Sequence, residues 1–486
     1  MSAALAPLVP PVLLLGPSGA GKSTVAPLLA ARLGFSVVDL DARARAVDLA
    51  TDGLPRLRVR EHLALKEALT EGAVVVATGA GVIDVDENHP LLRKGVVVVI
   101  DVDHATSLSR LRDAPHRPWL PPVGHPDRAS AFAARENDRA QRRRQLADIV
   151  VDGSGPAELV AAAIERAVRS WKLPSSGDGD VHDMLDLDGG TDGVVIADRA
   201  VAARLPRTDV VIDIADDKKR FALVESLLAQ LIARGVDRRH TIVAVGGGVL
   251  LDVVGLTAAL HHRGTPWRCV PTTLLAMVDA GLGGKTAVDV VVDGALVRNA
   301  AGRFHPPASS HVWPGFLSSL SPTAIRHGRA EMLKHLLLGA HGDDEGLDAK
   351  AIAASRGFKA AVVDRDPDER HLRHMLNFGH TFAHAIESRF GYAHGDAVLH
   401  GLQFATELSA LFAGLDGAVL RAVQARVAAL APPPLPALDD DDRRALLAAM
   451  GRDKKRPGRF VLLSATGTAV LATLPDDVVD EALRRL

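Results

Sequence analysis

A glycine-rich loop near the N-terminus has the residue types needed to bind a nucleoside triphosphate. Residues 16–24 read Gly-Pro-Ser-Gly-Ala-Gly-Lys-Ser-Thr and match the phosphate-loop pattern G-x4-G-K-[ST] in full. An apolar run precedes the loop and a helical pattern follows over residues 25–33, so backbone N–H groups can surround phosphate oxygens at a helix N-terminus. Lys22 is expected to reach the β- and γ-phosphates, and Ser23 to ligate Mg²⁺. The residues predicted at ATP are Gly16, Gly19, Gly21, Lys22, Ser23 and Thr24.

A second glycine-rich turn and several charged residues farther along could serve redox or metal chemistry. Gly246-Gly247-Gly248 follow an apolar strand and precede an apolar helix, which alone is a weak dinucleotide signal. Glu331 and Lys334 share one helix face, as do His380 and His384 at a four-residue spacing. The chain has 20 histidines, so position on a helix does not by itself separate a ligand from a surface or core histidine.

The elements that must position these residues alternate between strands and helices. Short apolar runs separated by helical spacing predict an N-terminal α/β domain with a parallel sheet and flanking helices. A second α/β pattern runs to about residue 321, and from Pro322 the pattern is mainly helical. The predicted organisation is a first domain at 1–171, a Gly/Ser/Asp/Pro-rich linker at 172–190, an α/β domain at 191–321 and a helical domain at 322–486. The strands expected in the two α/β domains lie at 12–15, 74–77, 96–101, 194–197, 210–214, 241–245 and 268–270.

Composition limits the classes of partner. The 486 residues carry 57 basic and 59 acidic side chains, for a formal net charge of -2, which gives no reason to expect nucleic acid or an anionic membrane. The single cysteine, Cys269, excludes an internal disulfide and suits a reducing compartment. No apolar stretch approaches the ~18 residues of a membrane span. We therefore expect a cytoplasmic enzyme that acts on small molecules.

The N-terminal third resembles the shikimate kinases. After the phosphate loop come Asp39-Leu-Asp41, an Arg58-x-x-Glu61 pair, Gly79-Ala-Gly81 and, before the last predicted strand, Arg139. Their order and spacing match the family, which implies a P-loop kinase fold and ATP-dependent phosphorylation of shikimate to shikimate 3-phosphate. A small hydroxylated carboxylate needs arginines for its anion and an aspartate for its hydroxyls.

The resemblance implies a role for each matching residue. Asp39 would join Ser23 around Mg²⁺, and Arg117, in a lid-like Arg-Pro-Trp-Leu segment, would contact the ATP phosphates. The residues implied at shikimate are Asp41, Arg58, Gly79, Gly81 and Arg139.

Residues from about Val181 to Leu486 resemble the 3-dehydroquinate synthases. The glycine loop at 246–248 is followed by Arg263-Gly, by Pro271-Thr-Thr-Leu-Leu-Ala-Met-Val-Asp279 and by Gly283-Gly-Lys285, almost residue for residue as in that family. This implies a Rossmann-like NAD-binding domain followed by a helical metal-binding domain. The implied reaction converts 3-deoxy-arabino-heptulosonate 7-phosphate to 3-dehydroquinate and phosphate, with NAD reduced and regenerated in each turnover.

The same resemblance implies the ligands of each cofactor. Glu331, His380 and His394 would bind Zn²⁺ or Co²⁺, a composition typical of a catalytic zinc site. The residues implied at NAD are Gly246, Gly247, Gly248, Asp252, Thr272, Thr273, Asp198, Asp216, Lys219, Arg298 and Asn299. The residues implied at the substrate are Lys285, Lys334, Lys359, Arg373, Asn377, His384, Arg263 and Asp279.

Three interpretations remain open on sequence grounds. The first is a bifunctional kinase and synthase. The second is a synthase joined to a nucleotide-binding module without kinase activity, which Ala80 in place of a middle glycine and a short segment after Asp41 would favour. The third is a related sugar-phosphate cyclase of secondary metabolism, against which the joint presence of Lys359, Arg373 and Asn377 with His384 argues. A homodimer through the synthase half is left open.

Overall fold

The computed structural model describes residues 5–44, 49–112, 120–174, 181–187, 193–214, 216–451 and 459–486. They divide into two compact units. The first consists of Met1–Lys172 with the short segments Asp364–Met375 and Val470–Ala472, and the second consists of Leu173–Val363, Leu376–Ala469 and Thr473–Leu486.

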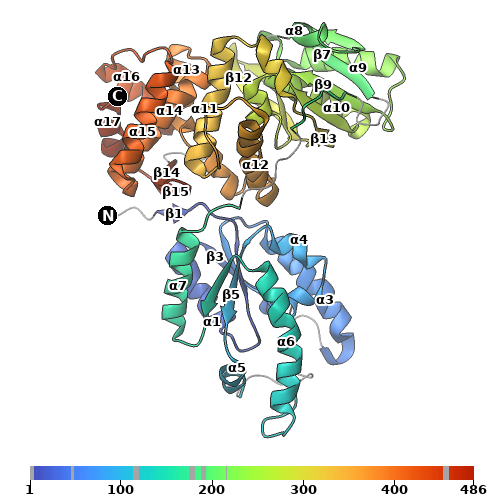
Figure 1. Ribbon diagram of the computed structural model, residues 1–486, viewed down its shortest axis with the longest axis vertical. Helices are drawn as coiled ribbons and strands as arrows, with labels where there is room; N and C mark the ends of the chain where they lie inside the picture. Colours follow the sequence, from blue (N-terminus) through green and yellow to red (C-terminus); the bar gives the residue numbers. More distant parts are fainter. Residues whose placement is uncertain are drawn as a thin grey trace. The chain divides into compact units, whose positions relative to one another are not determined.

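The first unit is built on a five-stranded parallel sheet in the order β3-β4-β2-β5-β6 (Figure 1). Its strands are β2 (Val12–Leu15), β3 (Ser36–Asp39), β4 (Val74–Ala77), β5 (Val96–Asp101) and β6 (Ile149–Asp152). Helices cover both faces, so the central strands read as continuous apolar runs rather than alternating ones.

Alternate residues of β2 enter two separate cores on the two faces of this sheet. Val12 and Leu14 pack with α1 (Lys22–Leu33) and α7 (Ala157–Arg169), whereas Leu13 and Leu15 pack with the C-terminal turns of α3 (Leu49–Ala68). The remaining elements of this unit are β1 (Ala6–Pro7), α2 (Leu40–Ala44), η1 (Val82–Asp84), α4 (Asn88–Leu92), α5 (His104–Arg110) and α6 (Arg128–Leu146).

The second unit contains another five-stranded parallel sheet, in the order β13-β10-β9-β7-β8. Its strands are β7 (Gly193–Asp198), β8 (Val210–Ile212), β9 (Thr241–Gly246), β10 (Trp267–Pro271) and β13 (Ser309–Ser310). One face packs against α9 (Phe221–Ala233) and α10 (Gly248–Leu260). The other packs against η4 (Ala276–Ala280), η5 (Pro314–Ser319), α11 (Pro322–Leu338) and α12 (Ala349–Arg365).

Part of the predicted linker belongs to the packing of the second unit. Val181 forms a bridge with Val312, and Leu187 is buried in the core beneath the sheet. The short elements that complete the α/β part are α8 (Arg199–Ala202), η2 (Asp216–Lys218) and η3 (His261–Arg263).

The C-terminal region is mainly helical, as predicted. Its elements are η6 (Leu372–Asn377), α13 (His380–Phe390), α14 (His394–Leu408), η7 (Ser409–Ala413), α15 (Gly417–Leu430), α16 (Asp440–Gly451), β14 (Arg459–Ala465), β15 (Thr468–Thr473) and α17 (Asp476–Leu483). The fold class expected from the sequence is confirmed, although strands β14 and β15 were not predicted. No helix among the described residues is long and apolar enough to cross a membrane.

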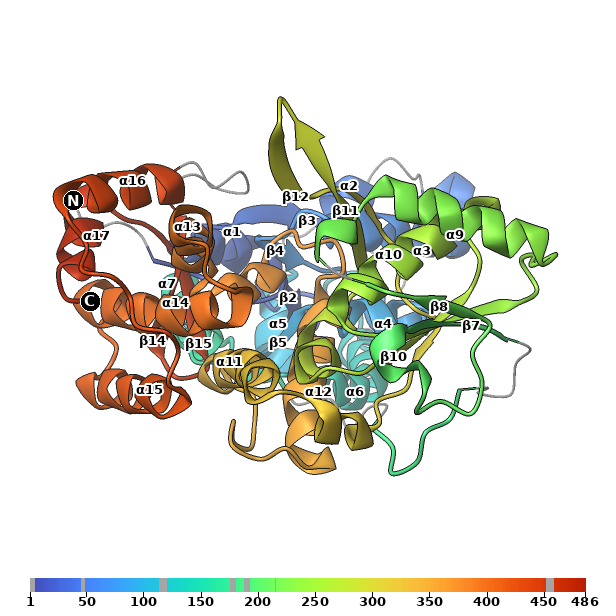
Figure 2. The ribbon, with the colours of Figure 1, turned by 90° about the horizontal axis from the view of Figure 1, so that it is seen from above.

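A long antiparallel hairpin was also missed. Strands β11 (Lys285–Val292) and β12 (Ala295–Phe304) pair with each other and form a projection on the second unit (Figure 2). Their turn residues Asp293 and Gly294 have φ angles of 51° and 80°. An Asp-Gly pair between apolar runs is a strong signal for a tight hairpin turn.

Candidate active sites

The phosphate loop of the first unit has the predicted geometry. Gly19 and Gly21 adopt φ angles of 85° and 91°, which a side chain would strain, and α1 begins directly after them at Lys22. Lys22 Nζ donates hydrogen bonds of 2.9 Å to the carbonyls of Gly16 and Pro17, which holds the ammonium over the loop. The loop therefore presents a helix N-terminus and a buried cation to one ligand.

Parallel strands bring the other predicted kinase residues to the same edge. β3 ends at Asp39 beside Ala77, the last residue of β4, and β4 neighbours β2, which leads into the phosphate loop. The carboxyl ends of parallel strands are the usual ligand edge of such a sheet. Asp39 also accepts a hydrogen bond of 3.0 Å from the Ala42 backbone N–H at the start of α2, which fixes its carboxylate there.

The predicted shikimate residues converge. A Cβ at Gly79 would lie 2.7 Å from both Asp41 Oδ1 and Glu61 Oε1, and one at Gly81 would overlap the Arg58 guanidinium. A side chain at either position would therefore displace these charged groups, whereas Ala80 between them is half-buried. Ala80 stands in place of the middle glycine of the resembled kinases. The flanking glycines, Gly79 and Gly81, are the two that face predicted binding groups.

Arg58 and Arg139 meet at a carboxylate that the sequence reasoning missed. Asp84, the last residue of η1, accepts from Arg58 Nη2 at 3.0 Å and from Arg139 Nε at 2.9 Å, and it also pairs with Arg139 Nη2. Arg58 donates through Nη1 to Glu61 at 2.5 Å, and Arg139 Nη1 lies 3.4 Å from Glu136. No spacing rule could have found Asp84, because its partners are 26 and 55 residues away.

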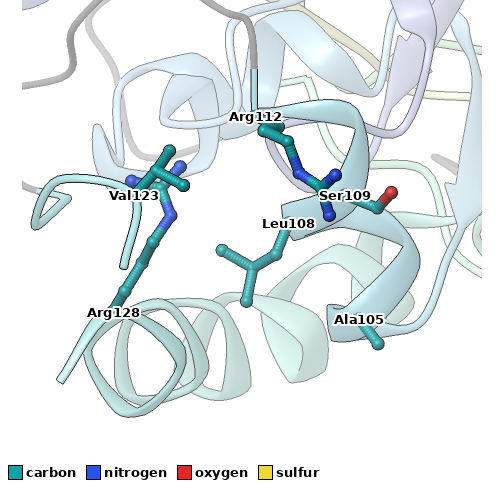
Figure 3. Close-up of a pocket in the computed structure, with 6 residues that line it drawn as sticks. All are labelled: Ala105, Leu108, Ser109, Arg112, Val123 and Arg128. Atoms are coloured by element: carbon teal, nitrogen blue, oxygen red, sulfur yellow. The ribbon is translucent and has the colours of Figure 1, made fainter. Parts of the chain in front are cut away.

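The predicted lid residue Arg117 lies outside the described residues. A recess of about 260 Å³ is lined by Ala105, Leu108, Ser109, Arg112, Val123 and Arg128 (Figure 3). Its described lining residues include none from the phosphate loop and none from the group around Asp84.

In the second unit, the three predicted metal ligands come together from three helices. His380 Nε2 lies 3.5 Å and His394 Nε2 lies 3.8 Å from Glu331 Oε1, and all three ligand atoms lie within 4.8 Å of one another. Glu331 is fully buried, and no donor among the described residues forms a hydrogen bond to its Oε1. It is ion-paired with Lys334 on the same helix.

Hydrogen bonds behind the two histidines orient their rings. His380 Nδ1 lies 3.2 Å from the Phe378 carbonyl, and His394 Nδ1 lies 2.7 Å from Glu387 Oε1. A carbonyl and a carboxylate can only accept, so each Nδ1 carries the proton and the neutral ring turns the lone pair of Nε2 toward Glu331. Three acceptor atoms then face one another, and a cation satisfies all three.

The electrostatics of the cluster follow from its burial. Burial disfavours the charged carboxylate of Glu331, but the charge of Lys334 is the largest opposing influence, and the pKa of Glu331 lies well below the usual value. Burial, followed by the charge of Lys334, lowers the pKa of His380 and keeps that ring neutral. Burial also opposes a charge on His394, yet Glu387 and Glu331 raise its pKa overall, so a proton competes with a metal ion for this ring.

Close helix packing places the ligands. Gly379 has a φ angle of 80° at the start of α13, and a Cβ there would lie 2.9 Å from the backbone of Gly401 in α14. At the start of α14, Asp396 accepts from Arg326 Nε at 2.8 Å and lies 3.2 Å from His327 Nε2, both on α11. Because Glu331 lies one turn after His327, this contact brings His394 beside it.

The metal cluster adjoins the glycine loop through η4. Asp279 on η4 lies within 4.8 Å of Glu331 and His335. The next residue of η4 is Ala280, and a Cβ placed on Gly248 would lie 3.1 Å from the Cβ of Ala280. Lys359 Nζ donates to the carboxylate of Asp279 at 2.6 Å and to its carbonyl at 2.5 Å. The glycine loop, Asp279, Lys359 and the ligand cluster therefore form one continuous site.

A polar cluster flanks the start of α10. Lys219 Nζ donates to Asp252 at 2.5 Å and to Asn299 Oδ1, and the Asn299 backbone N–H donates to Asp289 at 2.7 Å. Thr272 donates its backbone N–H to the Gly246 carbonyl at 3.0 Å, and Thr273 lies against Gly247. Burial, the largest influence, raises the pKa of Asp252 despite the opposing charge of Lys219. Seven of the residues predicted at NAD thus each contact another member of that set: Lys219, Asp252, Asn299, Thr272, Gly246, Thr273 and Gly247.

Other predicted residues lie at the margin of this site or apart from it. Arg298 is largely exposed, 3.7 Å from Glu387 Oε2, and Lys285 begins β11. Asp198 caps α8 by accepting from the Ala200 backbone N–H. The His384 ring is 5.6 Å from that of His380, and Asn377 ends η6, three residues before His380.

One predicted substrate residue lies away from the glycine loop, one is grouped with the first unit, and the side chain of a third predicted residue is not described. Arg263 is exposed in η3 at the C-terminal end of α10, opposite the glycine loop, with a left-handed φ of 66°. Arg373 belongs to the Asp364–Met375 segment of the first unit, where its guanidinium donates to the Pro367 carbonyl. The side chain of Asp216 lies outside what the structure describes.

Glu387 is the group at this site whose role was not predicted. It follows His380 at i+7 and His384 at i+3 on one helix, so a histidine-histidine-carboxylate stripe was visible in the sequence.

Comparison with known proteins decides the family. Residues 209–327 match the family model for the 3-dehydroquinate synthase N-terminal part, and residues 327–456 match the one for its C-terminal part. A 3-dehydroquinate synthase from Nitrobacter winogradskyi is 36% identical over 316 residues, covering 58% of this chain and 81% of the relative. The chain belongs to the 3-dehydroquinate synthase family. Its residues 18–169 match the shikimate kinase family model, so this synthase carries a kinase-family domain at its N-terminus.

Two further relatives resemble the synthase half. A 3-dehydroquinate synthase from Paracoccus denitrificans is 38% identical over 280 residues, covering 52% of this chain and 74% of the relative. The solved 2-epi-5-epi-valiolone synthase from Streptomyces hygroscopicus, with NAD⁺ and Zn²⁺ bound, is 26% identical with a TM-score of 0.56. The match covers 63% of this chain and 95% of that one. The synthase half thus shares its fold with that enzyme.

Proposed function

We propose that the chain catalyses two reactions of aromatic amino-acid biosynthesis. The second unit would convert 3-deoxy-arabino-heptulosonate 7-phosphate to 3-dehydroquinate and phosphate, using NAD⁺ and a divalent metal. The first would transfer the γ-phosphoryl group of ATP to shikimate. One observation carries the synthase proposal: Glu331, His380 and His394 converge on one point. Asp279 lies beside this cluster, and the residue after it contacts the glycine loop proposed to bind NAD⁺.

The residues present fit a divalent metal. Two neutral imidazole nitrogens and one buried carboxylate oxygen, with both imidazoles oriented from behind, form a three-ligand set that leaves room for substrate. Zn²⁺ or Co²⁺ held there would act as a Lewis acid that acidifies a substrate hydroxyl.

The protein groups around the cluster would hold the substrate and the nicotinamide in register. Gly246–Gly248 at the start of α10 would accept the pyrophosphate of NAD⁺, because the backbone comes close there and the helix N-terminus favours an anion. Buried Lys334 and Lys359 are cations beside the ligands and would orient the anionic substrate. Positioning by such groups can supply a large part of a rate enhancement.

Each activity can be tested by supplying one substrate at a time to the full-length protein. With the heptulosonate phosphate, NAD⁺ and Zn²⁺, we expect phosphate release matched one for one by dehydroquinate, without net NADH. With shikimate and Mg-ATP we expect ADP, and no ADP from the Lys22→Met variant. Phosphate release without dehydroquinate would instead favour a related sugar-phosphate cyclase, and ATP binding without shikimate-dependent ADP would favour a nucleotide-binding module.

The structure supports a working acceptor pocket in the kinase half. Asp41, Arg58, Glu61, Gly79 and Gly81 lie together at the carboxyl edge of the sheet. Asp41 would contact the acceptor hydroxyls, and the arginines would bind the carboxylate. The half-buried Ala80 and the segment after Asp41, where residues 45–48 are not described, are the positions on which the alternative of an inactive module depends.

A further inference from the structure

The two arginines proposed to bind the shikimate carboxylate are already engaged by carboxylates of the protein. Arg58 donates to Glu61 and Asp84, and Arg139 pairs with Asp84 and lies 3.4 Å from Glu136. Asp84 is the group shared by both arginines. Its two oxygens accept from both guanidinium groups in the same way as the carboxylate of a bound acceptor would.

We propose that Asp84 occupies the acceptor-carboxylate subsite from within and competes with the substrate for Arg58 and Arg139. This inference rests on the proposed kinase function and adds a residue that sets how tightly the acceptor binds.

The burial of the three acidic partners identifies the one that yields. The side chains of Glu61 and Glu136 are 5% and 1% exposed, whereas that of Asp84 is 30% exposed. Glu136 is also held by Arg143 at 2.8 Å, so its release would break a second buried ion pair. Asp84 ends a 3₁₀ helix of three residues, and a rotation of its side chain toward solvent breaks its hydrogen bonds to the two arginines and weakens its attraction to Arg135.

An incoming carboxylate must therefore replace Asp84 rather than fill a vacant pair of cations. The arginines exchange one anionic partner for another, so the net gain on binding is smaller than for two unpaired guanidinium groups. Removing the charge of Asp84 leaves Arg58 and Arg139 adjacent with a single carboxylate each, which favours the acceptor anion. Competition by Asp84 therefore weakens the binding of the acceptor carboxylate and does not change the affinity for ATP.

The test measures equilibrium binding of shikimate to the full-length protein with Mg-ADP present, by calorimetry, for wild type and Asp84→Asn. We expect Asp84→Asn to lower the Kd for shikimate on the order of fivefold to tenfold, as for a partly exposed ion pair lost to competition. The methyl ester of shikimate has no carboxylate charge, so its Kd should not change. Asp86→Asn, the same substitution at an exposed neighbour, should leave both values unchanged.

An unchanged or increased Kd in Asp84→Asn overturns the inference, because Asp84 would then be neutral or would hold the arginines in place. Equal shifts for shikimate and its ester also overturn it. Asp84→Ala is a second variant without the carboxylate, and the synthase activity of each variant is measured as a control for misfolding. If wild type forms ADP with shikimate but its Kd does not respond to Asp84, the inference alone fails. If no variant binds shikimate, the proposed kinase function fails with it.

Discussion

His380 Nε2 lies 3.5 Å from Glu331 Oε1, although both atoms are acceptors once the other ring nitrogen of His380 donates to the Phe378 carbonyl. His394 Nε2 faces the same oxygen from 3.8 Å with its own Nδ1 bound to Glu387. Such an arrangement is unfavourable for three neutral or anionic acceptors alone and favourable around a cation.

Glu387 should control how well His394 binds the metal. The Glu387→Gln variant keeps the shape but weakens the acceptor that fixes the His394 tautomer. We expect metal affinity to fall about 10- to 100-fold, as for other partners of metal-bound histidines. Competitive titration with a chromogenic chelator measures the change, and Glu225→Gln, exposed on α9, serves as the matched control. Equal affinities in both variants would show that Glu387 does not support the site.

Substitutions of Asp279 and Lys359 should have coupled, non-additive effects on the free energy of unfolding. Asp279→Ala leaves a buried ammonium without its carboxylate, and we expect a loss of about 2–4 kcal/mol, somewhat less than for a fully buried pair. Lys359→Met in the same chain removes the second charge, so the double variant should regain most of that loss. Thermal unfolding of the single and double variants measures the coupling free energy between the two residues. Additive losses of stability would contradict the prediction.

Glycine at position 79 should be required by the kinase half. A Cβ there would lie 2.7 Å from Asp41 and Glu61, so the carboxylate predicted to contact the acceptor hydroxyls must shift. A displacement of ~1 Å at a reacting group costs roughly 100-fold in rate. We therefore expect the Gly79→Ala variant to lose about that much in kcat/KM for shikimate. Gly155→Ala has open space around its Cβ and should leave the ADP assay unaffected. Equal activities in the two variants would place the acceptor elsewhere.

Asp396 should be needed for the position of His394. Its carboxylate joins the first turn of α14 to Arg326 and His327 on α11. Asp396→Ala leaves Arg326 without that partner and frees the first turn of α14, so metal affinity and the melting temperature of the synthase half should fall together. Arg426→Ala removes a more exposed ion pair on α15 and is the comparison. A lower melting temperature with unchanged metal affinity would separate Asp396 from the site.

Sequence predicted the local backbone context of the site best where its residues lie in one continuous motif. The phosphate loop and the glycine turn at 246–248 have their predicted strand–loop–helix context because glycine and helix periodicity are local properties. The meeting of Glu331 with His394 depends instead on the packing of α11 against α14 through Asp396 and Gly395, which no local spacing encodes. Asp84 is the extreme case, because its partners come from α3 and α6 and its own segment has no pattern of interest.

Missed strands have a similar explanation. The turn end of the β11–β12 hairpin leaves Val291, Val292 and Leu296 exposed, so its apolar residues do not mark a buried face there, and the Asp-Gly turn is the clearest local signal. The prediction of a mainly helical C-terminal region passed over β14 and β15, whose apolar runs of four buried residues each are too short to separate from helix by periodicity.

Anomalous diffraction at the zinc edge from crystals of the full-length protein grown with Zn²⁺ tests the central claim most directly. We predict one strong peak at ~2.0–2.2 Å from Glu331 Oε1, His380 Nε2 and His394 Nε2. The same peak should be lost in His380→Ala, with ATP binding retained. A peak at other residues, or no peak at this cluster with zinc in excess, would contradict the metal site and the synthase chemistry built on it.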